Sequence, residues 1–155
     1  MSHADGPVLR PYSVVEANRA LVFIERVARD LVEQFDSLIE SQTMLDTADK
    51  AGDGDAYARI REEIKTTFDK LLHYRQSLED IGVELQDWAK GIVHFPFLAD
   101  RREVQLCWML GEEQVGYWHE VGQCLESRRK VAELTKPGKY ISEKRTSDSS
   151  VTQPR

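Results

Sequence analysis

The chain has 155 residues, of which 41% are hydrophobic and 31% charged, which is typical of a globular protein and excludes a wholly disordered chain. This length suffices for one domain with a buried core. The net charge of −6 is unevenly spread, because residues 127–155 hold 8 basic and 3 acidic residues while the remainder is acidic.

The acidic body argues against a broad phosphate-binding face, so we expect no nucleic-acid binding except through the basic tail, residues 127–155, which we predict to be largely disordered. Apolar runs are too short for a membrane span and no signal sequence opens the chain, so we expect a cytoplasmic protein without membrane association. Cys107 and Cys124 lack CxxC spacing. They are therefore predicted to be reduced thiols.

A long helix is predicted to begin near residue 13, after a flexible lead-in over residues 1–11. Ser13 and Glu16 have the Ser-x-x-Glu spacing of a capping box, in which each side chain accepts a hydrogen bond from the other residue's backbone. Apolar residues then recur three and four positions apart, which is a heptad seam that fades near Leu45. The seam comprises Val14, Ala17, Leu21, Ile24, Ala28, Leu31, Phe35 and Leu38.

Residues 47–55 have the small, polar and glycine-rich composition of a turn. Their Asp-x-Asp spacing also occurs in calcium loops, but the full EF-hand pattern is missing, so a helix connection is the favoured interpretation. A second seam runs from Tyr57 to Ile81, and Gly82 stands where a left-handed helix cap is expected. Two seams of equal length predict an antiparallel, coiled-coil-like hairpin.

The hairpin is longer than the rest of the chain can cover. We therefore predict a homodimer formed by a four-helix arrangement. From Val83 the pattern changes to short β-rich runs, which predicts an α+β, mainly α protein: a long helical hairpin followed by a small antiparallel β segment, within one domain over residues 12–126.

The simplest hairpin in the β segment pairs Leu110 with Val115. Trp108 then lies opposite Tyr117, and Cys107 lies opposite Trp118. Because neighbouring strand residues point to opposite faces, this register puts Cys107 and His119 on different faces. Both faces are apolar, so we expect the helices to cover one and a partner or ligand to cover the other.

Several blocks of the β segment resemble an uncharacterised prokaryotic family called domain of unknown function 2203. They are Gly-Val-Glu-Leu-Gln-Asp from Gly82, Gly-Ile-Val-His-Phe-Pro from Gly91, Arg-Glu-Val-Gln-Leu-Cys-Trp-Met-Leu-Gly-Glu from Arg102, and Gly-Tyr-Trp-His-Glu from Gly116. The Tyr-Ser-Val-Val-Glu-Ala-Asn segment at residues 12–18 is similar to the start of that family's first helix. The resemblance implies no activity. It suggests a cytoplasmic prokaryotic protein whose characteristic residues lie in the β segment.

Two hypotheses for function follow. The favoured one is a non-enzymatic interaction or assembly protein, whose aromatic β surface binds another protein or a small ligand. The residues predicted to form that surface are Glu103, Cys107, Trp108, Tyr117, Trp118 and Glu120.

The alternative is a metal-binding protein or a metal- or thiol-dependent enzyme centred on His119 with His94 or Cys107. Imidazole, thiolate and carboxylate groups are ligands for zinc or iron. The predicted register separates Cys107 from His119, so the metal pair expected from the sequence is His94 with His119. No resident cofactor is predicted otherwise.

Overall fold

A computed structural model of the chain describes residues 10–123 and 125–134. The elements in chain order are α1 (Val14–Ala51), α2 (Gly54–Asp80), β1 (Glu84–Asp87), β2 (Ile92–Ala99), β3 (Arg102–Met109), β4 (Tyr117–Glu120), the 3-10 turn η1 (Leu125–Ser127), β5 (Arg129–Lys130) and the 3-10 turn η2 (Val131–Glu133). Two long helices followed by an antiparallel sheet confirm the predicted α+β, mainly α class.

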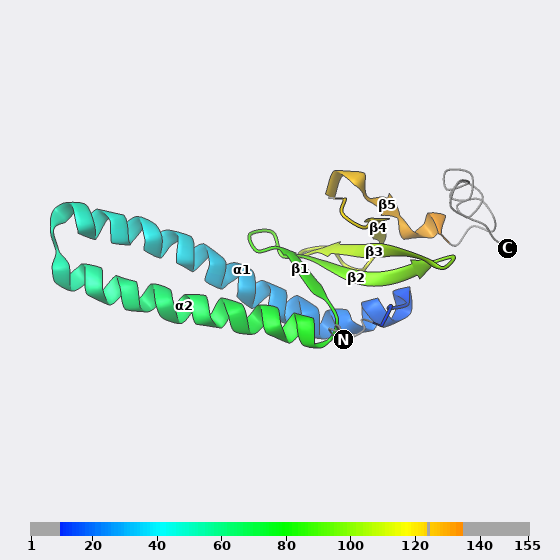
Figure 1. Cartoon of the computed structure of the whole chain (residues 1–155), viewed down its shortest axis with the longest axis horizontal. Helices are drawn as coiled ribbons and strands as arrows, with labels where there is room; N and C mark the ends of the chain where they lie inside the picture. The colour runs from blue at the N-terminus through cyan, green and yellow to red at the C-terminus, as the bar shows by residue number, and fades with distance from the viewer. Residues whose placement is uncertain (1–9, 124, 135–155) are drawn as a thin grey trace, which may run out of the picture. The chain divides into compact units, whose positions relative to one another are not determined.

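The described residues divide into two compact units. The hairpin unit comprises residues 20–93 and 109–111. The sheet unit comprises residues 10–19, 94–108 and 112–134, apart from residue 124. Within the hairpin unit, α1 and α2 run antiparallel as predicted (Figure 1).

Helix α1 begins with the predicted capping box. The Ser13 backbone N–H donates to the Glu16 carboxylate at 2.9 Å, and the Glu16 N–H donates to the Ser13 hydroxyl at 3.0 Å. Four members of the heptad seam, Leu21, Ile24, Ala28 and Leu31, are buried in the hairpin unit. The helix continues to Ala51, six residues past the point where the apolar pattern fades, because buried Ala48 still packs inward.

Helix α2 is closed at both ends by local hydrogen bonds. The Asp53 carboxylate accepts from the Ala56 N–H at 3.1 Å, so this aspartate of the turn serves as a helix cap. At the other end Gly82 has a φ of 80°, and the N–H groups of Val83 and Gly82 donate back to the carbonyls of Leu78 and Glu79. These two backbone hydrogen bonds form a Schellman motif. They confirm the prediction that Gly82 caps the C-terminal end of this helix.

The five strands form one sheet in the order β1-β2-β3-β4-β5. Strands β3 and β4 pair antiparallel with Cys107 opposite Tyr117, Leu106 opposite Trp118 and Gln105 opposite His119. The register expected from the sequence, with Cys107 opposite Trp118, is therefore wrong by one residue.

Large apolar side chains fill one face of the sheet unit. Leu106 and Trp118 share that face as cross-strand partners, and both are fully buried. The start of α1 is attached to the same unit, since the Tyr12 ring meets Phe95 edge-on at 5.1 Å and the Tyr12 N–H donates to the Pro96 carbonyl at 2.7 Å.

The ordered chain continues past residue 126, where the sequence placed the end of the domain. Strand β5 pairs with β4, with Arg129 opposite Trp118 and Lys130 opposite Tyr117. Residues 127–134, the first part of the predicted tail, therefore belong to the sheet unit. Residues 1–9 of the predicted lead-in, the tail beyond residue 134 and Cys124 lie outside the described residues. Among the residues that are described, neither helix carries a stretch apolar enough to cross a membrane.

Gly52 and Gly91 of the hairpin unit allow the effect of side-chain packing on stability to be separated from the effect of backbone strain. Both have a φ of +68°, but a Cβ at Gly91 would lie 3.0 Å from Leu110 Cβ and 3.1 Å from Val32 Cγ2, whereas one at Gly52 meets nothing within 4 Å. We expect Gly52→Ala to lower the free energy of unfolding by about 1 kcal/mol, the cost of a left-handed residue. Gly91→Ala should cost roughly 2–4 kcal/mol, because overpacking is added. Urea titration of the two variants measures the difference, and equal losses would contradict the packing described here.

Candidate functional site

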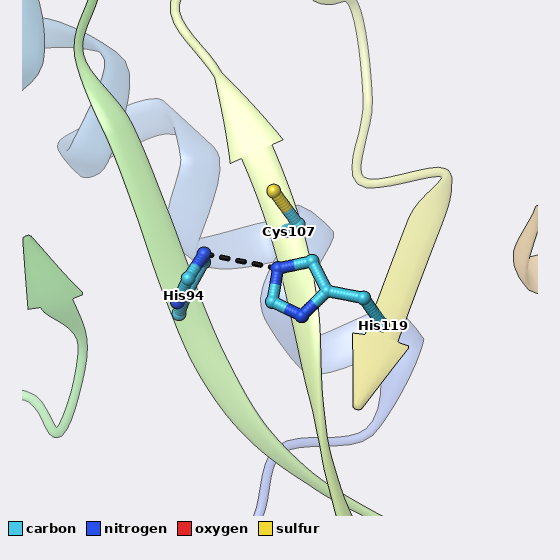
Figure 2. A group of neighbouring side chains, drawn as sticks. All are labelled: His94, Cys107 and His119. Atoms are coloured by element: carbon cyan, nitrogen blue, oxygen red, sulfur yellow. Dashed lines mark hydrogen bonds between the residues drawn. The ribbon is translucent and has the colours of Figure 1, made fainter. Parts of the chain in front are cut away.

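Three potential metal ligands converge on one face of the sheet unit. His94 comes from β2, Cys107 from β3 and His119 from β4 (Figure 2). One ligand atom of each residue lies within 4.8 Å of those of the other two. The three residues expose only 3%, 0% and 1% of their surface. Across residues 10–123 and 125–134, this is the one such group of three His, Cys, Asp or Glu residues.

The convergence follows from the register of β3 and β4. Because side chains alternate along a strand, Cys107 shares a face with its partner Tyr117 and with His119 two residues on. The sequence interpretation that placed Cys107 and His119 on opposite faces is thus corrected. The sequence predicts His94 and His119 as a pair of metal ligands. The structure places the Cys107 thiol beside them as a third potential ligand.

The physical reason for the different register lies in the connection between the strands. The predicted tight pairing of Leu110 with Val115 does not form, because the Val115 N–H donates instead to the Asn18 side chain of α1 at 2.8 Å. The Trp108 indole N–H donates to the Glu112 carbonyl at 3.0 Å. These bonds hold residues 112–116 as a longer loop, and the ladder begins only at the pair of Cys107 and Tyr117.

The hydrogen bonds of the two histidines fix which nitrogen of His119 carries the proton. The Nδ1 atom of His119 lies 2.9 Å from the Glu120 carbonyl oxygen, which only accepts, so Nδ1–H is the donor. The Nε2 atom of His119 then presents its lone pair to His94 Nε2, 3.1 Å away, which donates in the metal-free protein. The two rings meet edge-on, with centroids 4.6 Å apart.

Burial disfavours the charged forms of His94 and Cys107. Desolvation, followed by the neighbouring His119, lowers the pKa of His94 to about 4. Burial also raises the pKa of the Cys107 thiol, an effect that the nearby Arg128 opposes. At neutral pH His94 is therefore a neutral imidazole, the form that binds metals, and Cys107 is a thiol that must lose its proton to do so.

Arg128 lies beside the sulfur of Cys107, although no pattern in the sequence singles this residue out. Its guanidinium makes two hydrogen bonds to the Glu112 carboxylate, at 3.1 and 2.6 Å. It stands 4.0 Å from the centroid of the Tyr117 ring, and one N–H reaches Cys107 Sγ at 3.9 Å. In the sequence this residue is part of a Ser-Arg-Arg-Lys run that looks like a solvated basic tail. Only the position of β5 distinguishes it from its neighbours.

The residues predicted to form an aromatic surface are divided between the two faces. Trp108 and Trp118 are fully buried on the apolar face. Glu103 is exposed, and Glu120 is half-buried in an ion pair with Arg102. Of the predicted set, only Cys107 lies with the histidines, and Tyr117 is its cross-strand partner on the same face. The structure thus brings together His94, Cys107 and His119, and it places Trp108 and Trp118 on the opposite face.

The lowered pKa of His94 makes the stability of the metal-free protein depend on pH. The unfolded chain binds a proton at His94 near pH 6.5 and the folded chain only near pH 4, so stability falls as the pH decreases between these values. We expect a loss of at most about 3 kcal/mol in chelator-treated protein, measured by urea titration from pH 7 to 4. His94→Gln should flatten this dependence, whereas His73→Gln, at an exposed position of α2, should leave it unchanged. Identical slopes for wild type and His94→Gln would refute the assignment.

One comparison with known proteins gives a match. The family of uncharacterised conserved proteins DUF2203 matches residues 10–131, a range that includes His94, Cys107, His119 and Arg128. No curated protein and no solved structure matches the chain. Since the matched range covers most of its length, the chain belongs to the DUF2203 family of uncharacterised conserved proteins.

Proposed function

We propose that the protein binds one transition-metal ion, zinc first among the candidates, through His94 Nε2, Cys107 Sγ and His119 Nε2. The observation that carries this proposal is the convergence of the three ligand atoms within 4.8 Å in a buried site. Two imidazole nitrogens and one thiolate sulfur form a ligand set that suits zinc, and that iron or copper also accepts.

The distance between the two imidazole nitrogens supports a shared ion. Two nitrogens bound to one tetrahedral zinc lie about 3.3 Å apart, given Zn–N bonds of roughly 2.0–2.1 Å. His94 Nε2 and His119 Nε2 are already 3.1 Å apart. A sulfur and a nitrogen on the same ion lie about 3.6 Å apart. The three ligand atoms lie within 4.8 Å of one another, so the sulfur would approach the nitrogens by at most about 1.2 Å.

The surroundings of His119 are also those of a metal ligand. A histidine that binds a metal through one nitrogen commonly donates its other N–H to a carbonyl or carboxylate, which fixes the ring and its tautomer. The bond from His119 Nδ1 to the Glu120 carbonyl supplies that contact. For His94, binding through Nε2 requires the other neutral tautomer, with the proton on Nδ1.

A histidine pair that merely fills the core is the competing explanation. Burying two imidazoles and a thiol on one face costs free energy that an apolar replacement would avoid. A bound ion would compensate for that cost and would join β2, β3 and β4, because each strand contributes one ligand. Metal-binding free energy would then be folding free energy for the sheet unit.

We further propose that the helical hairpin associates with a second copy of the chain. The supporting observation is a group of large apolar side chains that remain exposed on α1 and α2. They are Val22, Phe23, Ile39, Met44, Phe68 and Leu72. Phe23 and Met44 are three heptads apart, and Phe68 and Leu72 are separated by four residues, so each pair lies along one helix face.

The metal proposal predicts about one bound ion per chain. Protein without a histidine tag, incubated in turn with Zn²⁺, Fe²⁺, Co²⁺ and Cu⁺ and then desalted, should retain close to one equivalent of at least one metal by elemental analysis. Cys107→Ser and His119→Ala should each lower retention at least tenfold, because two ligands bind far more weakly than three. The control His73→Ala removes an exposed histidine and should retain the wild-type amount.

A second readout separates specific binding from surface binding. At a free metal concentration 100-fold above Kd, the folded state gains about 2.7 kcal/mol, so the thermal midpoint should rise for wild type and not for His119→Ala. Wild-type protein that retains under a tenth of an equivalent of every metal refutes the proposal. So does a His73→Ala variant that loses as much metal as Cys107→Ser.

The dimer proposal predicts that light scattering gives twice the mass of the chain at micromolar concentrations. Phe68→Ser should shift the equilibrium towards the monomer, because the exposed ring is 51% accessible in the single chain and is expected to be covered in the dimer. Leu98→Ser is the matched control, since Leu98 is 50% exposed but lies on β2. A monomer mass for wild type, or equal effects of the two substitutions, would rule out association through the hairpin.

A further inference from the structure

We infer that Arg128 is a positioning residue of the metal site, which donates an N–H hydrogen bond to the metal-bound sulfur of Cys107 and so limits how strongly that sulfur donates electrons to the ion. The inference rests on the proposed metal site and adds to it a group outside the ligands. Its basis is the contact of one guanidinium N–H with Cys107 Sγ at 3.9 Å.

The guanidinium is held in a single orientation by two partners. Its two terminal nitrogens donate to the two oxygens of Glu112, and its Cζ atom lies over the Tyr117 ring, 4.0 Å from the centroid. The side chains of Arg128 and Glu112 are only 13% and 20% exposed. A bidentate pair that is also stacked has little freedom to rotate, so the N–H directed at the sulfur is preorganised.

Three separate segments contribute to this arrangement. Glu112 lies in the connection between β3 and β4, Tyr117 is the cross-strand partner of Cys107, and Arg128 immediately precedes β5. Partly burying such an ion pair is costly and adds little net stability. Its placement against the sulfur, rather than at the exposed surface like the pair of Arg29 and Glu25, indicates a role in the site.

Glu112 also compensates for the positive charge of Arg128. A lone guanidinium beside a divalent ion would repel it, because two positive charges a few ångströms apart interact strongly where water is excluded. The Glu112 carboxylate neutralises Arg128, so the N–H dipole can act on the sulfur without adding net positive charge to the site. The thiolate is then the one charged ligand among the three.

The expected chemical consequence is spectroscopic. A hydrogen bond to a metal-bound thiolate stabilises the filled sulfur orbitals, so more energy is needed to transfer an electron from sulfur to the metal. Co²⁺ in the zinc position reports this energy as a near-ultraviolet sulfur-to-cobalt charge-transfer band. Removing the hydrogen bond should move the band to longer wavelength.

The experiment compares the cobalt-loaded full-length protein with three variants. Arg128→Met, which keeps an unbranched side chain but has no side-chain N–H, should move the band to longer wavelength. Arg128→Lys, which retains a donor and a positive charge, should return it towards the wild-type position. Arg129→Met is the matched control, because Arg129 lies over Trp118 on the apolar face, 5.5 Å from its ring centroid, and should leave the band unchanged.

The outcomes distinguish this inference from the proposed function. A wild-type protein that binds Co²⁺ and shows the band at the same wavelength as Arg128→Met overturns the role of Arg128 alone. A wild-type protein without the band overturns the thiolate ligand itself, and this inference with it. If circular dichroism shows that Arg128→Met does not fold, Arg128→Leu, which also has no side-chain donor, replaces it with the same expected shift. A purely structural role would alter stability in these variants without moving the band.

Discussion

The pairing of Cys107 with Tyr117 is the constraint on which the site depends. A slip of one residue between β3 and β4 would exchange the two faces of β4 relative to β3, and would turn His119 away from the sulfur. The buried tryptophan opposes such a slip. Trp118 is fully enclosed beside Leu106, and moving its indole to the other face would forfeit several kcal/mol of apolar burial. The apolar face therefore determines which polar residues meet on the opposite face.

The helices were predictable because their signals are local. The capping box involves residues three apart, and the Schellman motif at Gly82 involves residues five apart, so sequence spacing alone identifies both. The register was not predictable in the same way. It depends on Asn18, whose side chain holds Val115 although the two residues are 97 positions apart in the chain. No pattern within the β segment reveals a partner at that separation.

The candidate site shows the same division between local and long-range information. Histidines at positions 94 and 119 are conspicuous in short β-rich segments, and they could be selected as a pair. Cys107 was separated from them only by an assumed tight turn, which the bonds of Trp108 and Val115 prevent. A role for Arg128 could not be predicted from the sequence, because the two residues that follow it are also basic. What distinguishes Arg128 is the carboxylate of Glu112, 16 residues earlier, which no periodicity connects to it.

The two faces of β3 and β4 have opposite energetic roles. Positions 106, 108 and 118 place fully buried apolar groups on one side, and positions 107, 117 and 119 place a thiol, a phenol and an imidazole on the other. The first set contributes the apolar burial that stabilises the sheet unit, whereas burying the second set costs free energy unless each group has a partner. Hydrogen bonds among His94, His119 and the Glu120 carbonyl, and from Arg128 to the Cys107 sulfur, reduce that cost. A fold selected only for stability would gain by replacing the second set with apolar residues, so its presence on an otherwise well-packed sheet is the strongest reason to look for chemistry there.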